Sequence, residues 1–350
     1  MIDLGLLAVA FVIILVGAEL FTNGIEWFGR KLNLAEGAVG SVLAAVGTAL
    51  PETMIPLVAI VAGGSAADTD AIGVGAILGA PFMLATLALF VTGLAVLLLR
   101  ARRRTAATLE IDPVVLSKDV RYFALTYSLA IAVAFAPTDW WFARPLVAAA
   151  LIGLYVIYVR LHLQGEVVAS NEGPGPLRFH RLDPRGRRAD PAVPRLRVVN
   201  LQVLVALACI IGGALIFVRG VEHLSVSLGV APIFLALVIA PIATELPEKA
   251  NSVLWVRQNK DTLAMGNITG AMVFQACIPT VVALLLAPAA WSISDSALPF
   301  ASAVIAFIST AVVFWPIARG RALTGLRLLW GGPFYVCYLG IVAGRLFGVV

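Results

Sequence analysis

The sequence predicts an all-α polytopic membrane protein of about ten transmembrane helices, arranged as two inverted five-helix repeats. Of its 350 residues, 61% are hydrophobic and only 13% are charged, and the mean hydropathy is +0.98. These values lie far from those of water-soluble domains. Apolar runs of the roughly 17 to 25 residues that cross a bilayer recur along the whole chain. The two halves of the chain also align with each other.

The apolar runs give the order of the expected helices. The first run has no basic leader and no small-residue cleavage site, so we expect it to be a retained helix and not a signal peptide. The three cysteines lie inside apolar runs without the spacing of a metal site or a disulfide framework. The approximate limits of the runs are 2–23, 37–63, 71–99, 121–137, 140–162, 198–220, 229–256, 262–288, 297–316 and 328–349.

The formal net charge of +5 reports orientation and not nucleic-acid binding, because the basic residues gather in particular loops. The positive-inside rule places such loops in the cytoplasm. We therefore expect a multi-pass protein of the plasma (inner) membrane, with the central loop in the cytoplasm and both termini outside. The basic loops are those at Arg30 and Lys31, Arg100 to Arg104, Arg178 to Arg197, Arg257 and Lys260, and Arg319 to Arg327.

A polar stretch rich in Pro, Gly and Arg divides the chain into two halves. Residues 164–197 lack hydrophobic periodicity and are expected to form a cytoplasmic linker between helices 1–5 in residues 1–163 and helices 6–10 in residues 198–350. The halves align without a gap from Gly17 with Gly213 to Glu52 with Glu248, and roughly a third of these positions are identical. Because each half has an odd number of spans, the second half enters the membrane with opposite polarity, as in many secondary transporters.

The aligned segments GTALPE and ATELPE place glutamates inside two apolar runs. A carboxylate near the middle of a bilayer costs several kcal/mol, so Glu52 and Glu248 should face a partner, a cavity or an ion. A buried pairing with a neighbouring base is the alternative. We expect the closest positive charges, Lys249 and Arg257, to lie toward the cytoplasmic end.

Each glutamate follows a proline directly. Pro51 and Pro247 have no N–H and should break their helices, so that backbone carbonyls four residues earlier become free to bind a cation. These carbonyls belong to Gly47 and Ala243.

A threonine precedes each glutamate by four residues. Thr48 and Glu52 therefore share one helix face, and Thr244 and Glu248 share another. Two such faces that meet across a pseudo-twofold axis would form an oxygen-only cage, which suits hard cations such as Ca²⁺ or Na⁺. Glu52 and Glu248 are the predicted metal ligands.

In these motifs the sequence resembles the calcium/cation antiporter superfamily, the sodium/calcium exchanger group. Both alpha-repeats of that group carry G-T-S-L-P-E followed by G-N-x-x-G-S-N-x-F-N. The resemblance implies ten helices, with cation sites formed by helices 2, 3, 7 and 8. The matching segments here are GTALPE at 47–52, ATELPE at 243–248 and GNITGAMVFQ at 266–275.

The departures from the family pattern alter the expected ligand set. The serine and final polar positions of the first repeat are Ala80 and Leu84, so helix 3 should contribute no side-chain ligand. In the second repeat the serine position is Ala271, while Gln275 keeps an amide. Glu245 replaces the serine of the second motif and adds a third carboxylate.

Three carboxylates in a low-dielectric site would repel one another unless a cation or proton is bound. We therefore expect a secondary active antiporter that moves Ca²⁺ or another hard cation in exchange for H⁺ or Na⁺ by alternating access. A monovalent cation (Na⁺)/proton antiporter is the alternative in this class. A channel or a non-transporting membrane scaffold is the alternative in a different class.

Other features carry less weight. The chain has no HExxH motif, nucleophile elbow or phosphate-binding loop, so it is not expected to be an enzyme or to hold a cofactor. Its expected partners are inorganic cations and the lipid bilayer, and the sequence does not indicate an oligomeric state. Glu19 and Glu26 are expected to pair near the interface with Arg30 or Asn23, and His162 is expected to be solvated.

Overall fold

The described part of the chain is helical throughout, and its only β-type pairing is an isolated bridge between Thr108 and Thr324. The computed structural model describes residues 2–49, 53, 67–137, 139–165, 174–183, 194–228, 245–293 and 297–346. The helices are α1 (Ile2–Lys31), α2 (Glu36–Ala38), η1 (Val39–Ala44), α3 (Ala45–Thr48), α5 (Ala67–Met83), η2 (Leu84–Ala88), α6 (Leu89–Leu98), η3 (Arg100–Arg102), α7 (Pro113–Ala132), η4 (Val133–Phe135), α8 (Ala143–Leu163), η5 (Arg178–Leu182), α9 (Leu196–Leu228), α12 (Leu246–Arg257), α13 (Asp261–Leu286), α14 (Ala297–Ala318), α15 (Gly325–Leu328) and α16 (Gly331–Leu346).

These helices confirm the predicted fold class. Among the described residues, 7 helices are long and apolar enough to cross a membrane. A shorter apolar helix covers Glu36–Thr48, where the sequence predicted the start of the second span. The first sixteen residues of the predicted span 229–256 lie outside the described residues, and α12 forms its remainder.

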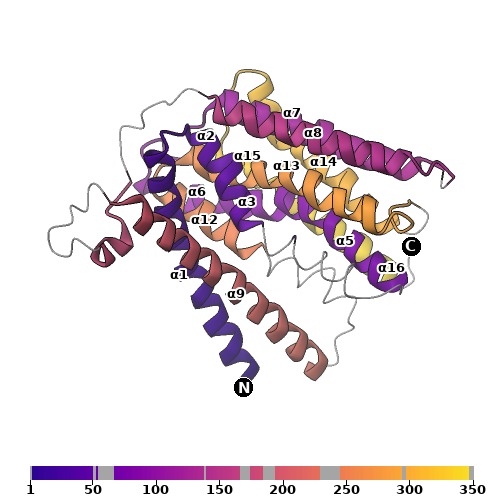
Figure 1. Ribbon diagram of the computed structural model, residues 1–350, viewed down its shortest axis with the longest axis horizontal. Coiled ribbons are helices and arrows are strands. Elements are labelled where there is room, and N and C mark those ends of the chain that lie inside the picture. Colours follow the sequence, from indigo (N-terminus) through magenta and orange to yellow (C-terminus); the bar gives the residue numbers. More distant parts are fainter. Residues whose placement is uncertain are drawn as a thin grey trace.

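Helix α13 is the central helix of the molecule (Figure 1). In the most apolar 18-residue stretch of α13, 83% of the residues are buried, whereas only 22% are buried in the corresponding stretch of α8. The exposed apolar side chains of α8 therefore mark a lipid-facing surface, and α13 is the internal element against which the others pack. Gly270 allows η1 to approach closely, because a Cβ at this position would lie 2.1 Å from the carbonyl oxygen of Ser41.

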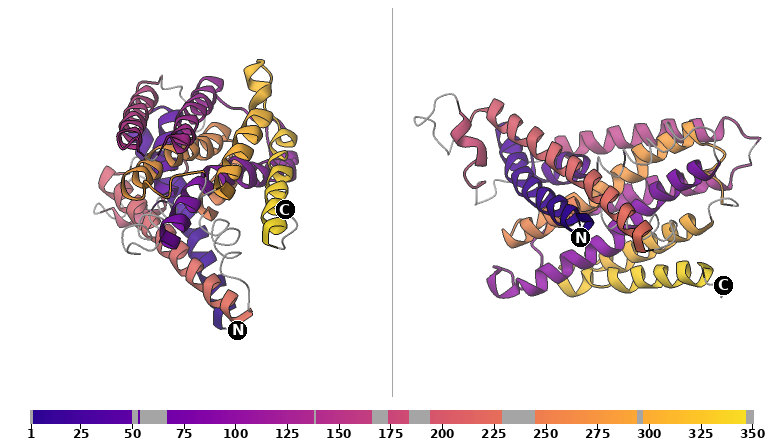
Figure 2. Two further views of the ribbon diagram at one scale, coloured as in Figure 1. Left: turned by 90° about the vertical axis from the view of Figure 1, so that its right-hand side faces the viewer. Right: turned by 90° about the horizontal axis from the view of Figure 1, so that it is seen from below.

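Helices α1 and α9 run side by side and project away from the other helices (Figures 1 and 2). Their contacts are reciprocal under the offset of 196 residues that aligns the two halves. Gly17 packs on Ile210, and the equivalent Gly213 packs on Ile14. In the same way, Gly24 packs on Val203, and Gly220 packs on Leu7. Such exchanged contacts are the signature of a twofold relation, so the repeat seen in the sequence is also a packing symmetry.

The acidic residues of α1 bind outside their own helix, so the predicted partners were wrong. Arg178 of η5 lies 2.8 Å from Glu19. Glu26 accepts a 2.8 Å hydrogen bond from the indole of Trp255 and forms an ion pair with Lys260. These contacts explain why α1 continues to Lys31, beyond the apolar run that ends near residue 23: its last two turns are held by polar partners.

Candidate functional site

Helix α12 begins at the second copy of the Pro-Glu motif. Glu245 occupies the N-cap position and Pro247 lies in the first turn. Proline is favoured there because the first N–H groups of a helix have no intrahelical acceptor and its fixed φ suits a helix start. Glu248 follows in the same turn, where the helix dipole favours negative charge. The motif therefore places a carboxylate at a helix start inside the protein.

The Glu248 side chain is fully buried and lacks the hydrogen bonds that normally accompany burial. Its carboxylate faces the Thr48 hydroxyl and interacts electrostatically with Glu245. Neither carboxylate oxygen has a hydrogen-bond partner among the described residues. Buried polar groups without protein partners are rare in native proteins, and such groups often bind an ion or a water molecule. The first and second halves of the chain thus meet at this carboxylate.

Asn267 of α13 connects the two motifs. Its side-chain oxygen accepts a 3.2 Å hydrogen bond from the Thr48 hydroxyl, and its nitrogen donates a 3.3 Å hydrogen bond to the backbone carbonyl of Glu248. This asparagine lies in the GNITGAMVFQ segment but is not among the predicted site residues. Its position as the second residue of the motif was the available signal.

Thr48 and Gly47 lie in the last turn of α3, which ends at Thr48. The last carbonyls of a helix have no intrahelical donor, and the Gly47 carbonyl belongs to this turn, but its role as a free backbone oxygen stays a prediction. The four remaining predicted residues lie outside the described residues. They are Pro51, Glu52, Ala243 and Thr244.

Glu245 forms a buried ion pair with Lys249, a residue that the sequence predicts to lie toward the cytoplasmic end. The ammonium lies 2.8 Å from the nearer Glu245 oxygen, and the two side chains are 7% and 1% exposed. The spacing of four residues on one helix could have predicted this pair. Lys249 therefore belongs to the candidate site, where it neutralises one of the three predicted carboxylates.

Asn251 adds further buried polar atoms one turn after Glu248. The residue is fully buried, and neither atom of its amide has a hydrogen-bond partner among the described residues. The other oxygen of Glu245 is also buried without one. A site that contains several buried oxygen atoms without hydrogen-bond partners fits a hard cation as the transported ion. Within the described residues, no group of three His, Cys, Asp or Glu side chains could hold a metal ion, so such a cage would need Glu52 or backbone oxygens.

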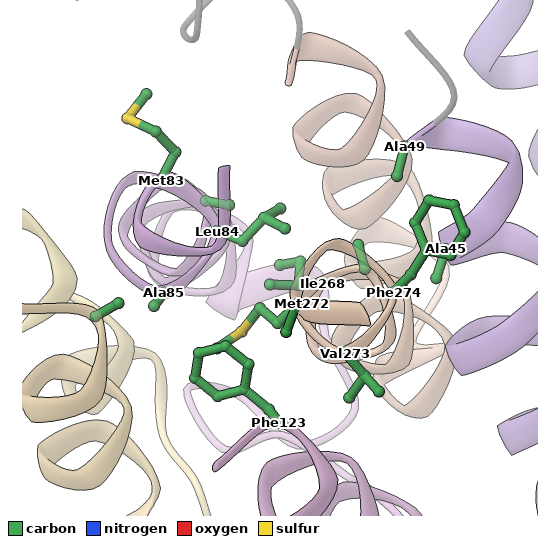
Figure 3. Close-up of a cluster of buried hydrophobic side chains, with 14 of the residues drawn as sticks. Ala45, Ala49, Met83, Leu84, Ala85, Phe123, Ile268, Met272, Val273 and Phe274 are labelled. Atoms are coloured by element: carbon green, nitrogen blue, oxygen red, sulfur yellow. The ribbon is translucent and has the colours of Figure 1, made fainter. Parts of the chain in front are cut away.

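Apolar side chains fill positions of helices 3 and 8 that are polar in the family pattern. Leu84 and Ala271 are 0% exposed and Ala80 is 6% exposed. Leu84 points toward Ile268 and Met272 of α13 (Figure 3). The side chains at these positions carry no oxygen or nitrogen atom. Gln275 is fully buried on α13, two turns beyond Asn267.

A second polar cluster surrounds Asp119 of α7 and was not predicted. Ser41 and Thr269 donate hydrogen bonds of 2.7 and 2.6 Å to one carboxylate oxygen, and Tyr158 donates one of 2.9 Å to the other. The Nε2 atom of His162 lies 2.9 Å from that second oxygen, and its side chain is 0% exposed. The expectation that His162 is solvated was therefore wrong. The cluster fixes η1 and α13, which carry the candidate site, against α7 and α8.

Replacement of Asp119 with alanine is expected to destabilise the protein by about 3 kcal/mol or more, because it leaves the buried hydroxyls of Ser41, Thr269 and Tyr158 without their acceptor, at about 1 to 3 kcal/mol for each unsatisfied group. The measurement is chemical or thermal unfolding in detergent. Asp112→Ala is the matched control, because Asp112 caps α7 through Val114 and Val115 and its loss should cost only about 1 kcal/mol. Equal destabilisation by the two variants would contradict the assigned role of the cluster.

The fold and the site define a class: a helical membrane transporter with two related halves and a buried carboxylate site between them. The family model described as "Sodium/calcium exchanger protein" matches residues 2–164 and 199–347. The chain belongs to the sodium/calcium exchanger family. Its members are secondary transporters and not enzymes, and family membership supports cation antiport.

Two curated proteins and a set of solved structures resemble the chain. The "Putative antiporter CaxA" of Alkalimonas amylolytica is 25% identical over 280 residues, which cover 80% of this chain and 79% of that protein. The "Uncharacterized membrane protein MJ0091" of Methanocaldococcus jannaschii is 20% identical, with 77% of each chain covered. A structure of the sodium-calcium exchanger NCX_Mj soaked with 100 mM Na⁺ and 10 mM Sr²⁺ has a TM-score of 0.71 at 16% identity and covers 97% of each chain. The structural likeness supports the ten-helix, two-repeat fold.

Proposed function

We propose that the protein is a secondary active antiporter that moves Ca²⁺, or another hard cation, across the membrane in exchange for H⁺ or Na⁺. The observation that carries the proposal is the fully buried Glu248 carboxylate, whose oxygens have no hydrogen-bond partner among the described residues. A bound cation would supply the missing interaction, since buried charges persist when they are paired or coordinate a metal.

The proposed cation ligands come from both halves of the chain. Glu52, Glu248 and Glu245 provide carboxylates, Thr48 and Thr244 provide hydroxyls, and Gln275 provides an amide. Gly47 and Ala243 provide carbonyls next to the helix breaks at Pro51 and Pro247. To this set, the described contacts add Asn267 as the residue that holds Thr48 and Glu248 together.

One specific contact keeps a Na⁺/proton antiporter as the alternative. Because Lys249 pairs with Glu245, two of the three carboxylates remain to balance a bound ion. Two carboxylates still match one divalent cation when both are ionised, whereas one protonated carboxylate would leave a site for a monovalent ion. The charge state of Glu52 and Glu248 thus distinguishes a divalent-cation antiporter from a Na⁺/proton antiporter.

Cation-dependent thermal unfolding of the purified protein in detergent tests the cargo directly. Millimolar Ca²⁺ is expected to raise the unfolding temperature at constant ionic strength, because a ligand that binds only the folded state stabilises it. Mg²⁺ should have a smaller effect, since it sheds its water reluctantly. Stabilisation by Na⁺ alone, with no response to Ca²⁺, would favour the alternative.

We also propose the domain division and the orientation inferred above, with residues 1–163 and 198–350 as the halves and the linker 164–197 in the cytoplasm. Hydrogen bonds between the basic loops support their location on the same side of the membrane. The Leu109 N–H donates to the Leu323 carbonyl, and the Arg104 N–H donates to the Asn259 side chain. Accessibility of single cysteines in the linker and near the termini, measured on intact cells of an expression host, tests this topology.

A further inference from the structure

A hollow of about 300 Å³ lies where α14 ends and the chain turns toward α15. Trp315 lines it from the end of α14, and Arg327 lines it from α15. The connecting loop contributes Arg319, Arg321 and Thr324. It is remote in sequence from the candidate cation site, and none of its lining residues contributes to that site.

The three arginines of this hollow lie together without a neutralising carboxylate among the described residues. Arg319, Arg321 and Arg327 are exposed, and no salt bridge joins any of them to a carboxylate of the described residues. In contrast, Arg103 in the adjacent loop is buried and lies 2.7 Å from Asp261. The hollow therefore presents concentrated positive charge that the described protein does not neutralise.

Aromatic side chains place the hollow at the level of the membrane interface. Trp315 and Trp330 are 54% and 51% exposed, and Leu326 is 64% exposed. Tryptophan at the ends of membrane helices lies at the depth of the lipid headgroups. The Arg319 guanidinium lies over the Trp315 ring at 4.6 Å from its centroid, a cation–π geometry that limits the movement of the arginine.

The backbone of the hollow is fixed before any ligand binds. The Arg321 N–H donates a 2.8 Å hydrogen bond to the Pro316 carbonyl, which closes the turn at the end of α14. The Gly325 N–H donates a 2.8 Å hydrogen bond to the Ala107 carbonyl, and Thr108 pairs with Thr324. Because the loop is held on both sides, the site is preorganised and loses little entropy on binding.

We propose that this hollow binds the phosphate of an anionic phospholipid headgroup. Arginine pairs with phosphate through two parallel N–H donors, and basic pockets between membrane helices bind anionic headgroups. The exposed Leu326 and tryptophans contact the glycerol and acyl region, which a free anion lacks. The bound lipid would hold the α14–α15 loop against the loop at 107–109.

Lipid-dependent thermal unfolding of the delipidated full-length protein tests the proposal. Added phosphatidylglycerol is expected to raise the unfolding temperature, whereas phosphatidylcholine and inorganic phosphate are expected to have little effect. The triple variant Arg319→Gln, Arg321→Gln, Arg327→Gln should weaken the apparent affinity for phosphatidylglycerol by roughly 100-fold, at about fivefold for each basic residue.

The matched control removes the same charge from exposed arginines outside the hollow, through Arg100→Gln, Arg102→Gln and Arg257→Gln. This variant should keep most of the phosphatidylglycerol response. If both triple variants lose the phosphatidylglycerol response equally, the response arises from general attraction of the lipid to a basic surface, and the proposal is overturned. An equal response to inorganic phosphate, or no response of the parent protein to phosphatidylglycerol, would also overturn it. If the first triple variant does not fold, Arg321→Gln alone is compared with Arg102→Gln.

Discussion

The Glu248→Gln variant is expected to lose cation transport and keep its fold. Glutamine has nearly the same shape, and the carboxylate oxygens that it replaces have no hydrogen-bond partner among the described residues, so little native bonding is lost. The negative charge that would attract a cation disappears, however. A loss of about 2.8 kcal/mol in cation binding corresponds to roughly 100-fold in affinity. The same result is expected for Glu52→Gln through the repeat.

Calcium uptake into proteoliposomes measures this loss, with size-exclusion profiles and unfolding temperatures as the checks on folding. Glu19→Gln is the matched control, because it removes a carboxylate from an exposed ion pair with Arg178 whose side chains are 55% and 54% exposed. Exposed pairs contribute little, so this variant should transport as the parent does. Parent-level uptake by Glu248→Gln would remove Glu248 from the transport site.

The helices and the repeat could be predicted because hydropathy and alignment are local properties of the sequence. Most observed helices coincide with the predicted runs, and the aligned glycines Gly17 and Gly213 make equivalent contacts between α1 and α9. The extra length of some helices was missed, because polar residues inside them lowered the hydropathy. Helix α7 begins at Pro113, eight residues before the predicted start at 121, and includes the buried Asp119.

The site was less accessible to prediction because its partners come from distant positions. Glu248 and Thr48 followed from the repeated motif, and Lys249 could have been found from its spacing to Glu245. The Asp119 cluster could not, since no sequence pattern relates residues that are 78 and 150 positions away, as Ser41 and Thr269 are. Only the packing of η1, α7 and α13 brings these side chains together.

Calcium transport is expected to be driven by a pH gradient in the absence of sodium. The apolar side chains at Ala80, Leu84 and Ala271 are buried and leave few oxygens for several sodium ions. Glu248 and Glu245 interact electrostatically in a buried site, where water does not screen their charges. Glu248 should therefore either be protonated or bind the cation. Protons then compete with the cation, and the apparent cation affinity should rise with pH.

The Glu245→Gln variant is expected to flatten this pH dependence. It leaves the buried Lys249 ammonium without its partner at 2.8 Å, so that the ammonium offsets the charge of Glu248 and proton and cation compete less for that carboxylate. The double variant Glu245→Gln, Lys249→Gln removes both charges of the pair and should restore a pH dependence close to that of the parent. Flux is measured in proteoliposomes from mildly acidic to mildly alkaline pH, with and without sodium on the opposite side. Strict sodium dependence without a pH response would show that other oxygens replace the missing ligands, because only a site with enough of them can hold several sodium ions.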